Sequence, residues 1–454
     1  MFFIIISGII YAESVFFIKE VKREFAILGG QPFHFEGYRF VKKIILPGNR
    51  MTIQVGENKE AKRMAVFLNG NIQEEFEQLG DDFYFSEDGN WLAYGGIRDG
   101  KTDIKINHFI FDKDQNGFTN DSHLLMIRDG KFSGRFKFSR DGKHFAYLLL
   151  TEDKKHVLFM DNQPLNQCDW IGDEFKFTPD GENIVYSCRQ NDTFYLIKNQ
   201  ELLLSKTSYL THLHFSPDGK RIAYIQKKSK DSRPFFVIDG IASNDHILTG
   251  KINQDICFFF SPDSRKVAYI ASNKDNKYFV VINSKEENKY DEISFIDGVI
   301  FSSDSRDYAY IAKDKGKSFI VYNGNITKQY DERYQPTCLK FSPDGKHLAY
   351  VVNAKDKSGD FVVVDGVESE KYPRVRQVFF SPDSKNIIYP IYRKDYTTMV
   401  VNGQEGKKMN FINYYDFARK GDLAFQDDNT FTYFAVPDVN INEEIVIREK
   451  IINN

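Results

Sequence analysis

One ten-residue motif recurs along the chain and constrains the fold more than any other feature of the sequence. Each copy starts with Phe, continues with Ser or Thr, carries Asp at the fourth place and ends with Tyr. Most copies begin about 40 residues after the previous one, and a period of this length indicates a fold built from repeated structural units. The eight Phe anchors are Phe85, Phe138, Phe177, Phe215, Phe260, Phe301, Phe341 and Phe380.

The middle of the motif has the chemistry of a turn between two strands. In Ser-Pro-Asp-Gly, as at 342–345, Pro presets φ, Ser and Asp bond nearby backbone amides, and Gly accepts a left-handed conformation. Three copies carry serine in place of this glycine (Ser264, Ser305 and Ser384), which indicates that the position is not strongly strained. The Phe is therefore predicted to end one strand, and the Tyr to lie in the next.

A second pattern follows the motif in most units. Continuous apolar runs such as 235–240 (FFVIDG), 319–324 (FIVYNG) and 361–366 (FVVVDG) end in Asp-Gly or Asn-Gly. A run without alternation is typical of a strand buried on both faces, and these dipeptides favour the type I′ hairpin. A more polar segment, such as 290–293, then leads to the next Phe. One unit is therefore predicted to be four antiparallel strands.

Four-stranded units of about 40 residues are typical of the blades of β-propellers. The motif F-S-P-D-G-K-x-x-A-Y, complete at 341–350, resembles the WD-repeat-like motif of TolB-type propellers, and the resemblance covers roughly residues 40–430. It implies an all-β disc with a central channel and loop-lined faces. The chain departs from that family's pattern of six blades behind an N-terminal α/β domain. We predict a single β-propeller of about 8–10 four-stranded antiparallel blades within residues 13–454. The alternative is two smaller propellers, although no linker divides the repeats.

Weaker copies of the unit flank the eight clear ones. Residues 43–79 keep the order of strands and hairpins, 417–436 form a degenerate last unit, and 25–40 resemble the second half of a unit. We expect the N- and C-terminal strands to share one blade and so to close the ring. Closure leaves only short, protected sheet edges.

The first twelve residues bear on location. Residues 1–12 are almost wholly apolar and too short to span a bilayer. They resemble the apolar core of a secretory signal peptide, with the small Ala12 before Glu13. The chain is therefore predicted to be periplasmic or secreted, without a transmembrane span. The alternative is a cytoplasmic protein in which this stretch is a buried first strand.

The four cysteines, Cys168, Cys188, Cys257 and Cys338, form no CxxC pair. An even number permits two disulfides. However, Cys257 and Cys338 occupy the same place in two repeats and should lie apart in space. We predict buried free thiols, because free Cys packs as a small hydrophobe.

One inserted loop has the spacing of a calcium site. Oxygen-bearing side chains stand at its positions 1, 3, 5 and 9, and Gly117 stands at position 6, where a sharp turn is needed. The alternative is a polar hairpin without metal. The predicted calcium-loop residues are Asp112, Asp114, Asn116, Phe118, Asn120 and Asp121.

Other chemical patterns are weaker. Residues 95–102 satisfy the phosphate-loop pattern GxxxxGK[ST], but they lie between two predicted strands, whereas that chemistry needs the loop to open a helix. His212 and His214 are predicted to share one face of a strand, as two ligands of a zinc site would, but no third ligand is evident. No GxSxG elbow is present.

These observations favour a protein that binds rather than catalyses. A net charge of −3 argues against nucleic acid as a partner. We predict a non-enzymatic scaffold that binds protein partners and needs no cofactor, except for the possible calcium. The alternative is a glycan- or peptide-binding propeller, or a propeller enzyme, that uses the mouth of the central channel. Loop aromatics that could form a recognition patch are Tyr392, Tyr396, Tyr414 and Tyr415.

Overall fold

The computed structural model describes most of the chain as strands joined by turns. The described residues are 22–27, 39–45, 52–68, 71–86, 90–111, 118–127, 131–206, 210–227, 234–243, 258–409, 423–425, 427–435 and 445–452. They include no helix long and apolar enough to cross a bilayer. The chain divides into two compact units: the 31–255 unit, and the 256–454 unit, which also includes residues 1–30.

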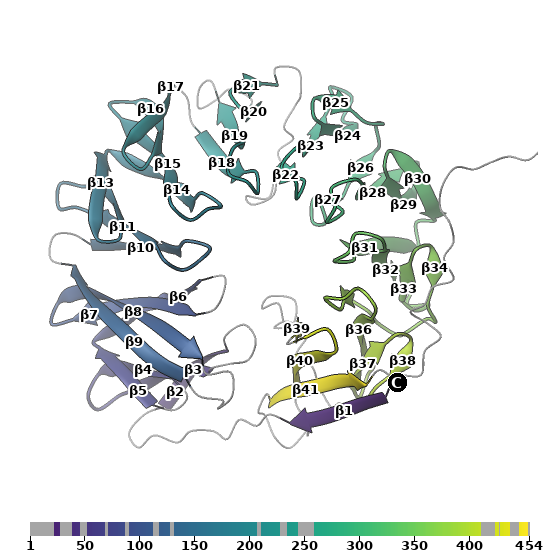
Figure 1. The fold of residues 1–454 in the computed structure, drawn as a ribbon, viewed down its shortest axis with the longest axis horizontal. Helices are drawn as coiled ribbons and strands as arrows, with labels where there is room; N and C mark the ends of the chain where they lie inside the picture. Colours follow the sequence, from purple (N-terminus) through teal and green to yellow (C-terminus); the bar gives the residue numbers. More distant parts are fainter. Residues whose placement is uncertain are drawn as a thin grey trace, which may run out of the picture. The chain divides into compact units, whose positions relative to one another are not determined.

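The 31–255 unit contains five four-stranded antiparallel sheets, which we number blades 1 to 5 in chain order (Figure 1). The first strands β10, β14 and β18 lie along one edge of this unit. Blade 1 has β2 (Arg39–Ile45), β3 (Thr52–Asn58), β4 (Arg63–Leu68) and β5 (Asn71–Phe76); blade 2 has β6 (Gln78–Phe85), β7 (Trp91–Arg98), β8 (Lys101–Phe111) and β9 (Phe118–Ile127); blade 3 has β10 (Lys131–Phe138), β11 (Phe145–Leu150), β12 (His156–Met160) and β13 (Gln163–Cys168); blade 4 has β14 (Trp170–Phe177), β15 (Ile184–Gln190), β16 (Thr193–Lys198) and β17 (Glu201–Lys206); blade 5 has β18 (Leu210–Phe215), β19 (Ile222–Lys227), β20 (Pro234–Ile238) and β21 (Ile241–Ala242).

The 256–454 unit contains five more sheets, blades 6 to 10. In blade 7 the first strand is split, so that β26 and β27 both pair with β28. Blade 6 has β22 (Phe258–Phe260), β23 (Val267–Ser272), β24 (Tyr278–Ile282) and β25 (Lys285–Glu286); blade 7 has β26 (Glu292–Ile293), β27 (Val299–Phe301), β28 (Tyr308–Asp314), β29 (Lys317–Tyr322) and β30 (Asn325–Tyr330); blade 8 has β31 (Tyr334–Phe341), β32 (Leu348–Ala354), β33 (Phe361–Val364) and β34 (Val367–Glu368); blade 9 has β35 (Phe379–Phe380), β36 (Ile387–Tyr392), β37 (Thr397–Val401) and β38 (Gln404–Glu405); blade 10 has β39 (Leu423–Phe425), β40 (Thr430–Ala435), β41 (Ile445–Ile452) and β1 (Lys22–Ile27).

Both ends of the chain contribute to blade 10. The N-terminal strand β1 pairs antiparallel with the C-terminal strand β41, in the register Lys22↔Ile452 to Ile27↔Ile447. The predicted blade shared by the two ends is therefore confirmed. The predicted class, an all-β propeller of four-stranded antiparallel blades, is confirmed as well.

The predicted hairpins also have the expected backbone. Asp161 and Asn162 have φ of 50° and 65°, and Asn323 and Gly324 have φ of 48° and 77°. Two successive left-handed residues are what a type I′ turn requires, and its twist suits the strands on either side. The apolar runs are buried on both faces, as in β33 and β37.

The core consists of apolar layers between neighbouring blades. One layer joins Leu148 and Leu158 of blade 3 to Phe175 and Tyr186 of blade 4. Comparable layers join blades 1 and 2, 2 and 3, 4 and 5, and each successive pair from 6 to 10. Among the described residues, motif tyrosines are some of the largest fully buried side chains: Tyr94, Tyr186, Tyr310 and Tyr389.

Two motif tyrosines, Tyr94 and Tyr350, meet the last residue of the preceding blade's fourth strand. Tyr330 and Tyr350 bring their hydroxyl oxygens to 3.0 Å, and Phe76 packs edge-on against Tyr94 at 6.0 Å between ring centroids. Such aromatic pairs contribute about 0.5–1.5 kcal/mol beyond the area they bury. The fourth strand of one blade thus recognises the second strand of the next.

The motif turn is closed by its own side chains. In blade 8 the Ser342 hydroxyl donates to Asp344 at 2.6 Å and accepts the His347 amide at 3.0 Å, while Asp344 accepts the Lys346 amide at 3.1 Å. Blades 3 to 9 share this network. In blade 3 the hydroxyl of Ser139 lowers the pKa of Asp141 to about 2.

The fifth place of the motif is left-handed whether it holds glycine or serine. Ser305 and Ser384 both have φ of 63°, and Gly345 has φ of 75°. The serines gain a contact in return: the Ser305 hydroxyl accepts the Asp263 amide of the preceding blade at 2.9 Å, and the Ser384 hydroxyl accepts the Asp344 amide at 2.9 Å. A hydrogen bond between blades therefore offsets the backbone strain at these serines.

The prediction of free thiols is wrong for two of the four cysteines. Cys168 in blade 3 and Cys188 in blade 4 form a disulfide with 5.7 Å between Cα atoms. Their positions in the repeat are equivalent to those of Tyr330 in blade 7 and Val352 in blade 8. We call the interface between two neighbouring blades a seam; at the seam between blades 3 and 4, a covalent bond replaces the contact between an aromatic and an aliphatic side chain. Cys338 is free, as predicted, and burial raises the pKa of its thiol. Cys257 and residues 1–12 lie outside the described residues.

We expect the disulfide to stabilise the seam between blades 3 and 4. It closes a loop of 20 residues, and cross-linking a loop of this length removes unfolded-state entropy equivalent to about 3 kcal/mol. The variant Cys168→Ser/Cys188→Ser should lose roughly that free energy of unfolding in urea denaturation. Adding a reductant should destabilise the wild type similarly and leave the variant unchanged; equal effects on both would contradict this role.

Two glycine-to-serine substitutions should differ in their effect on stability. A Cβ at Gly142 would lie 2.4 Å from the Trp91 ring, whereas a Cβ at Gly345 would lie 2.9 Å from the rotatable Ser303 hydroxyl. At Gly345 the new hydroxyl can accept the Asp304 amide, as happens in the next blade. Gly345→Ser should change the free energy of unfolding by less than about 1 kcal/mol, and Gly142→Ser should lower it by about 1–3 kcal/mol. Equal losses in urea denaturation would refute the inter-blade hydrogen bond.

Candidate functional site: a carboxylate-bound histidine between two blades

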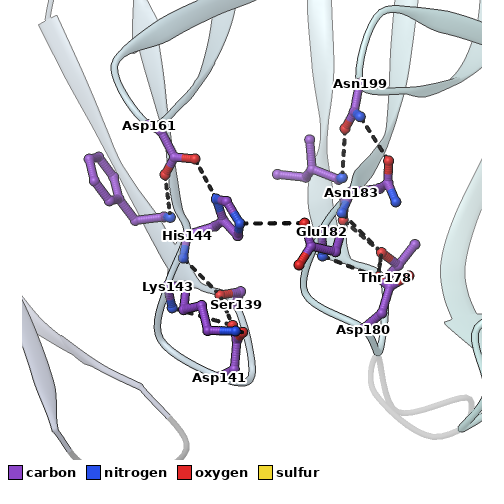
Figure 2. Close-up of polar contacts among 12 residues, drawn as sticks. Ser139, Asp141, Lys143, His144, Asp161, Thr178, Asp180, Glu182, Asn183 and Asn199 are labelled. Carbon is purple, nitrogen blue, oxygen red and sulfur yellow. Dashed lines mark hydrogen bonds and ion pairs between the residues drawn. The ribbon is translucent and has the colours of Figure 1, made fainter.

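The candidate site is a histidine with a carboxylate near each of its ring nitrogens, and it lies between blades 3 and 4. His144 Nδ1 lies 2.6 Å from Asp161 Oδ2, and His144 Nε2 lies 3.8 Å from Glu182 Oε2 (Figure 2). Asp161 belongs to the same blade as His144, whereas Glu182 lies in the motif turn of the next blade. The imidazole is therefore held on one side and faces a second carboxylate on the other.

The Asp161 carboxylate makes two contacts, one with each oxygen. Its Oδ1 accepts the Phe145 amide at 3.0 Å, while its Oδ2 contacts the imidazole. The first contact fixes the carboxylate on the backbone of β11. A carboxylate fixed in this way selects one tautomer of the histidine and orients its ring, which leaves Nε2 as the outward-facing nitrogen.

Comparison between blades shows that this pair belongs to the construction of the repeat. In blades 3 to 9 the hairpin residue accepts a backbone amide of the second strand. In six of these seven blades it is aspartate where the seventh motif residue donates and asparagine where that residue accepts. Blade 6 is the exception, because its hairpin residue is Asn283 although the seventh motif residue is Lys266. The donor pairs are His144–Asp161, Arg221–Asp239 and His347–Asp365; the acceptor pairs are Asn183–Asn199, Asp307–Asn323 and Asn386–Asn402.

Glu182 is what distinguishes His144 from its counterpart. His347 makes the same 2.6 Å contact, to Asp365. In the next blade, however, the place of Glu182 is taken by Lys385. Of these two aspartate-bound imidazoles, therefore, only His144 has a glutamate at this place in the next blade.

The site has no nucleophile of the serine-hydrolase kind. Ser139, the nearest motif hydroxyl, is fully buried, donates to Asp141 at 2.7 Å and accepts the His144 amide at 3.0 Å. A hydroxyl occupied in this way cannot attack a substrate. The arrangement is suited to holding a cation or to ion pairing across the seam.

The predicted calcium loop lies mostly outside the described residues. Asp112, Asp114 and Asn116 fall there, while Phe118, Asn120 and Asp121 belong to strand β9. Calcium binding by this loop stays a prediction. Among the described residues, no group of three or more His, Cys, Asp or Glu side chains is arranged to hold a metal ion.

The phosphate-loop pattern is a hairpin, as expected. Residues 95–102 run from β7 into β8, and Asp99 and Gly100 have φ of 48° and 69° at the turn. The chain there forms a strand and not a helix, so the aligned amides and dipole that bind phosphates are lacking.

The two histidines of β18 do not follow simple strand alternation. His212 has a φ of 54°, and the pairing register shifts between Thr211 and His214. The regular alternation of side chains, on which we based the prediction that both imidazoles share a face, is therefore interrupted here. Burial lowers the pKa of His214 to about 4, so this imidazole is neutral at physiological pH.

Of the loop aromatics, the structure describes two. Tyr392 ends strand β36, and the ring of Tyr396 has Arg393 at 5.6 Å and Lys408 at 4.7 Å. Tyr414 and Tyr415 lie outside the described residues. A recognition patch made of these four aromatics stays a prediction.

Sequence reasoning missed a group of exposed aliphatic side chains on the fourth strands. Leu202 and Leu203 of β17 are 59% and 47% exposed, and Ile241 of β21 is 77% exposed. The register of β17 shifts opposite Leu196 and Ile197, and Leu203 is the extra residue of this bulge. The neighbouring Leu204 packs into the layer between blades 4 and 5, which also contains Ala242.

We expect Asp365 to make stability depend on the titration of His347. The hydrogen bond to Asp365 raises the pKa of His347 above its ordinary value. This contact therefore contributes stability at low pH, and the contribution is lost as pH rises through the folded-state pKa. Asp365→Asn should lower the pKa of His347 in an NMR titration and flatten the change in unfolding free energy between pH 6 and 8. An unchanged titration would contradict the assignment.

Comparisons with known proteins find similar folds and no related family. No protein-family profile and no curated protein matches the chain. Similar solved structures include a eukaryotic initiation factor (12% identity, TM-score 0.42, covering 78% of this chain and 97% of that one), TolB from Acinetobacter baumannii (15%, 0.29, 56% and 63%) and the Dos1 propeller (11%, 0.32, 68% and 88%). By its blade topology and its Phe-to-Tyr motif, the chain is an all-β propeller protein whose repeats resemble those of the TolB type.

Proposed function

We propose that the protein is a non-enzymatic scaffold that binds a protein partner along the outer strands of blades 4 and 5. The observation that carries the proposal is the exposure of Leu202, Leu203 and Ile241 on these strands. Apolar side chains left in water at a sheet edge favour association, because burying them against a partner removes that area from water.

The edge strands of other blades support this choice by contrast. The fourth strand of blade 1 carries Glu74 and Glu75 beside one exposed isoleucine, that of blade 3 carries Pro164, and that of blade 7 carries Lys328 beside one exposed isoleucine. Charges and proline on an edge strand discourage pairing with another chain. The strand β17 has three successive leucines, with charged residues only at its ends.

We further propose that the protein works outside the cytoplasm, in the periplasm or as a secreted protein. The disulfide between Cys168 and Cys188 supports this location, because structural disulfides persist in oxidising compartments and are rare in the cytosol. The apolar residues 1–12, with the pattern of a secretory signal, support it independently.

The interaction surface can be tested by charge substitution. Leu202→Glu/Leu203→Lys leaves the net charge unchanged and removes the apolar contact, so it should weaken partner capture from extracts of the native organism roughly tenfold or more. Ile326→Glu, on the edge of blade 7, is the matched control and should capture the partner like the wild type. Undiminished capture by the double variant, or equal loss in the control, would refute the proposal.

A further inference from the structure

The seam between blades 3 and 4 brings together two metal-binding side chains that the scaffold role does not use. The Nε2 atom of His144 and the Oε2 atom of Glu182 lie 3.8 Å apart, with side chains that are 28% and 63% exposed. This separation is too long for a hydrogen bond, which joins such atoms at about 2.7–3.2 Å. Two atoms that share a zinc ion at about 2.0–2.2 Å each lie roughly 3.4 Å apart in tetrahedral geometry.

The geometry points to a zinc-class divalent cation bound between blades 3 and 4 by His144 Nε2 and Glu182 Oε2. The more exposed Glu182 can shift by the few tenths of an ångström that this requires, because solvent surrounds most of its side chain. The remaining positions of the ion are open to water. Imidazole and carboxylate together suit borderline ions such as Zn²⁺ better than Mg²⁺ or Ca²⁺.

Asp161 supplies what such a histidine ligand needs on its other side. Its Oδ2 lies 2.6 Å from Nδ1, and its Oδ1 is fixed by the Phe145 amide. A carboxylate on the second nitrogen holds the tautomer that leaves Nε2 free to ligate, and it makes the imidazole a stronger ligand. Asp161 is therefore a positioning residue for the metal and not a ligand.

The seam itself is held in place. The disulfide between Cys168 and Cys188 links the same two blades, and Arg135 of blade 3 donates to the Gly172 carbonyl of blade 4 at 3.1 Å. Ligands on two separate sheets bind an ion well only if the sheets keep their spacing. A covalently joined seam meets that requirement.

Blade 8 provides a control within the same chain. His347 has the same aspartate contact, but Lys385 replaces the facing carboxylate in the next blade, and its ammonium group lies 3.4 Å from Asp383. A cation should therefore bind at His144 and not at His347. The substitution Lys385→Glu should in turn create a second site.

The test is titration of the metal-free full chain with ZnCl₂ in a calorimeter at pH 7.5, with thermal melts to show that each variant is folded. His144→Asn and Glu182→Gln should each remove one equivalent of bound zinc, and Asp161→Asn should weaken that equivalent by roughly 10–100-fold. His347→Asn should bind like the wild type, and Lys385→Glu should gain one equivalent.

The opposite results would overturn the proposal. Zinc stoichiometry that is the same in the wild type, His144→Asn and Glu182→Gln would show that these side chains hold no ion. A loss in His347→Asn as large as that in His144→Asn would show that any aspartate-bound imidazole suffices and that Glu182 is irrelevant. Partner capture by the variants of β17 is measured separately, so failure of the metal site leaves the scaffold proposal unaffected.

Discussion

The structure depends on the burial of motif tyrosines in the apolar layers between neighbouring blades. A four-stranded sheet that is apolar on both faces cannot remain alone in water, because each face exposes several aliphatic side chains. When neighbouring sheets stack, both faces are removed from water. The motif tyrosine lies within this contact, as Tyr350 does against Tyr330. The hairpins, turns and serine contacts between blades all serve to hold the sheets at the spacing this contact needs.

The seams follow one plan with different side chains. Where blades 1 and 2 meet, Phe76 fills the space left by Gly96, whose Cβ would lie 2.4 Å from the Phe76 ring. Where blades 7 and 8 meet, Tyr330 packs in the same layer as Val352, and where blades 3 and 4 meet, the two sides are joined by sulfur atoms. The position of the contact is the same at these seams, while its chemistry varies. Close packing leaves little room for any other solution.

The features predicted from the sequence are those whose causes lie within one repeat. The turn network of Ser342 and Asp344 and the Asn323–Gly324 hairpin involve only residues a few positions apart. The local sequence is therefore enough to predict them. The disulfide was missed because Cys168 and Cys188 belong to different repeats and to different places within them. An alignment of the fourth strand of one unit with the second strand of the next would have found it, since Phe76 and Gly96 occupy the same two places. The facing of His144 and Glu182 was missed for the same reason.

The sharing of blade 10 by the two ends of the chain bears on the order in which the protein folds. Strand β41 lies between β40 and β1, so β1 has no hydrogen-bonding partner within its sheet until β41 has been synthesised. During synthesis β1 therefore stays without its sheet partner until β41 follows. Blade 10 is therefore complete only when two strands that lie far apart in the sequence have both been made.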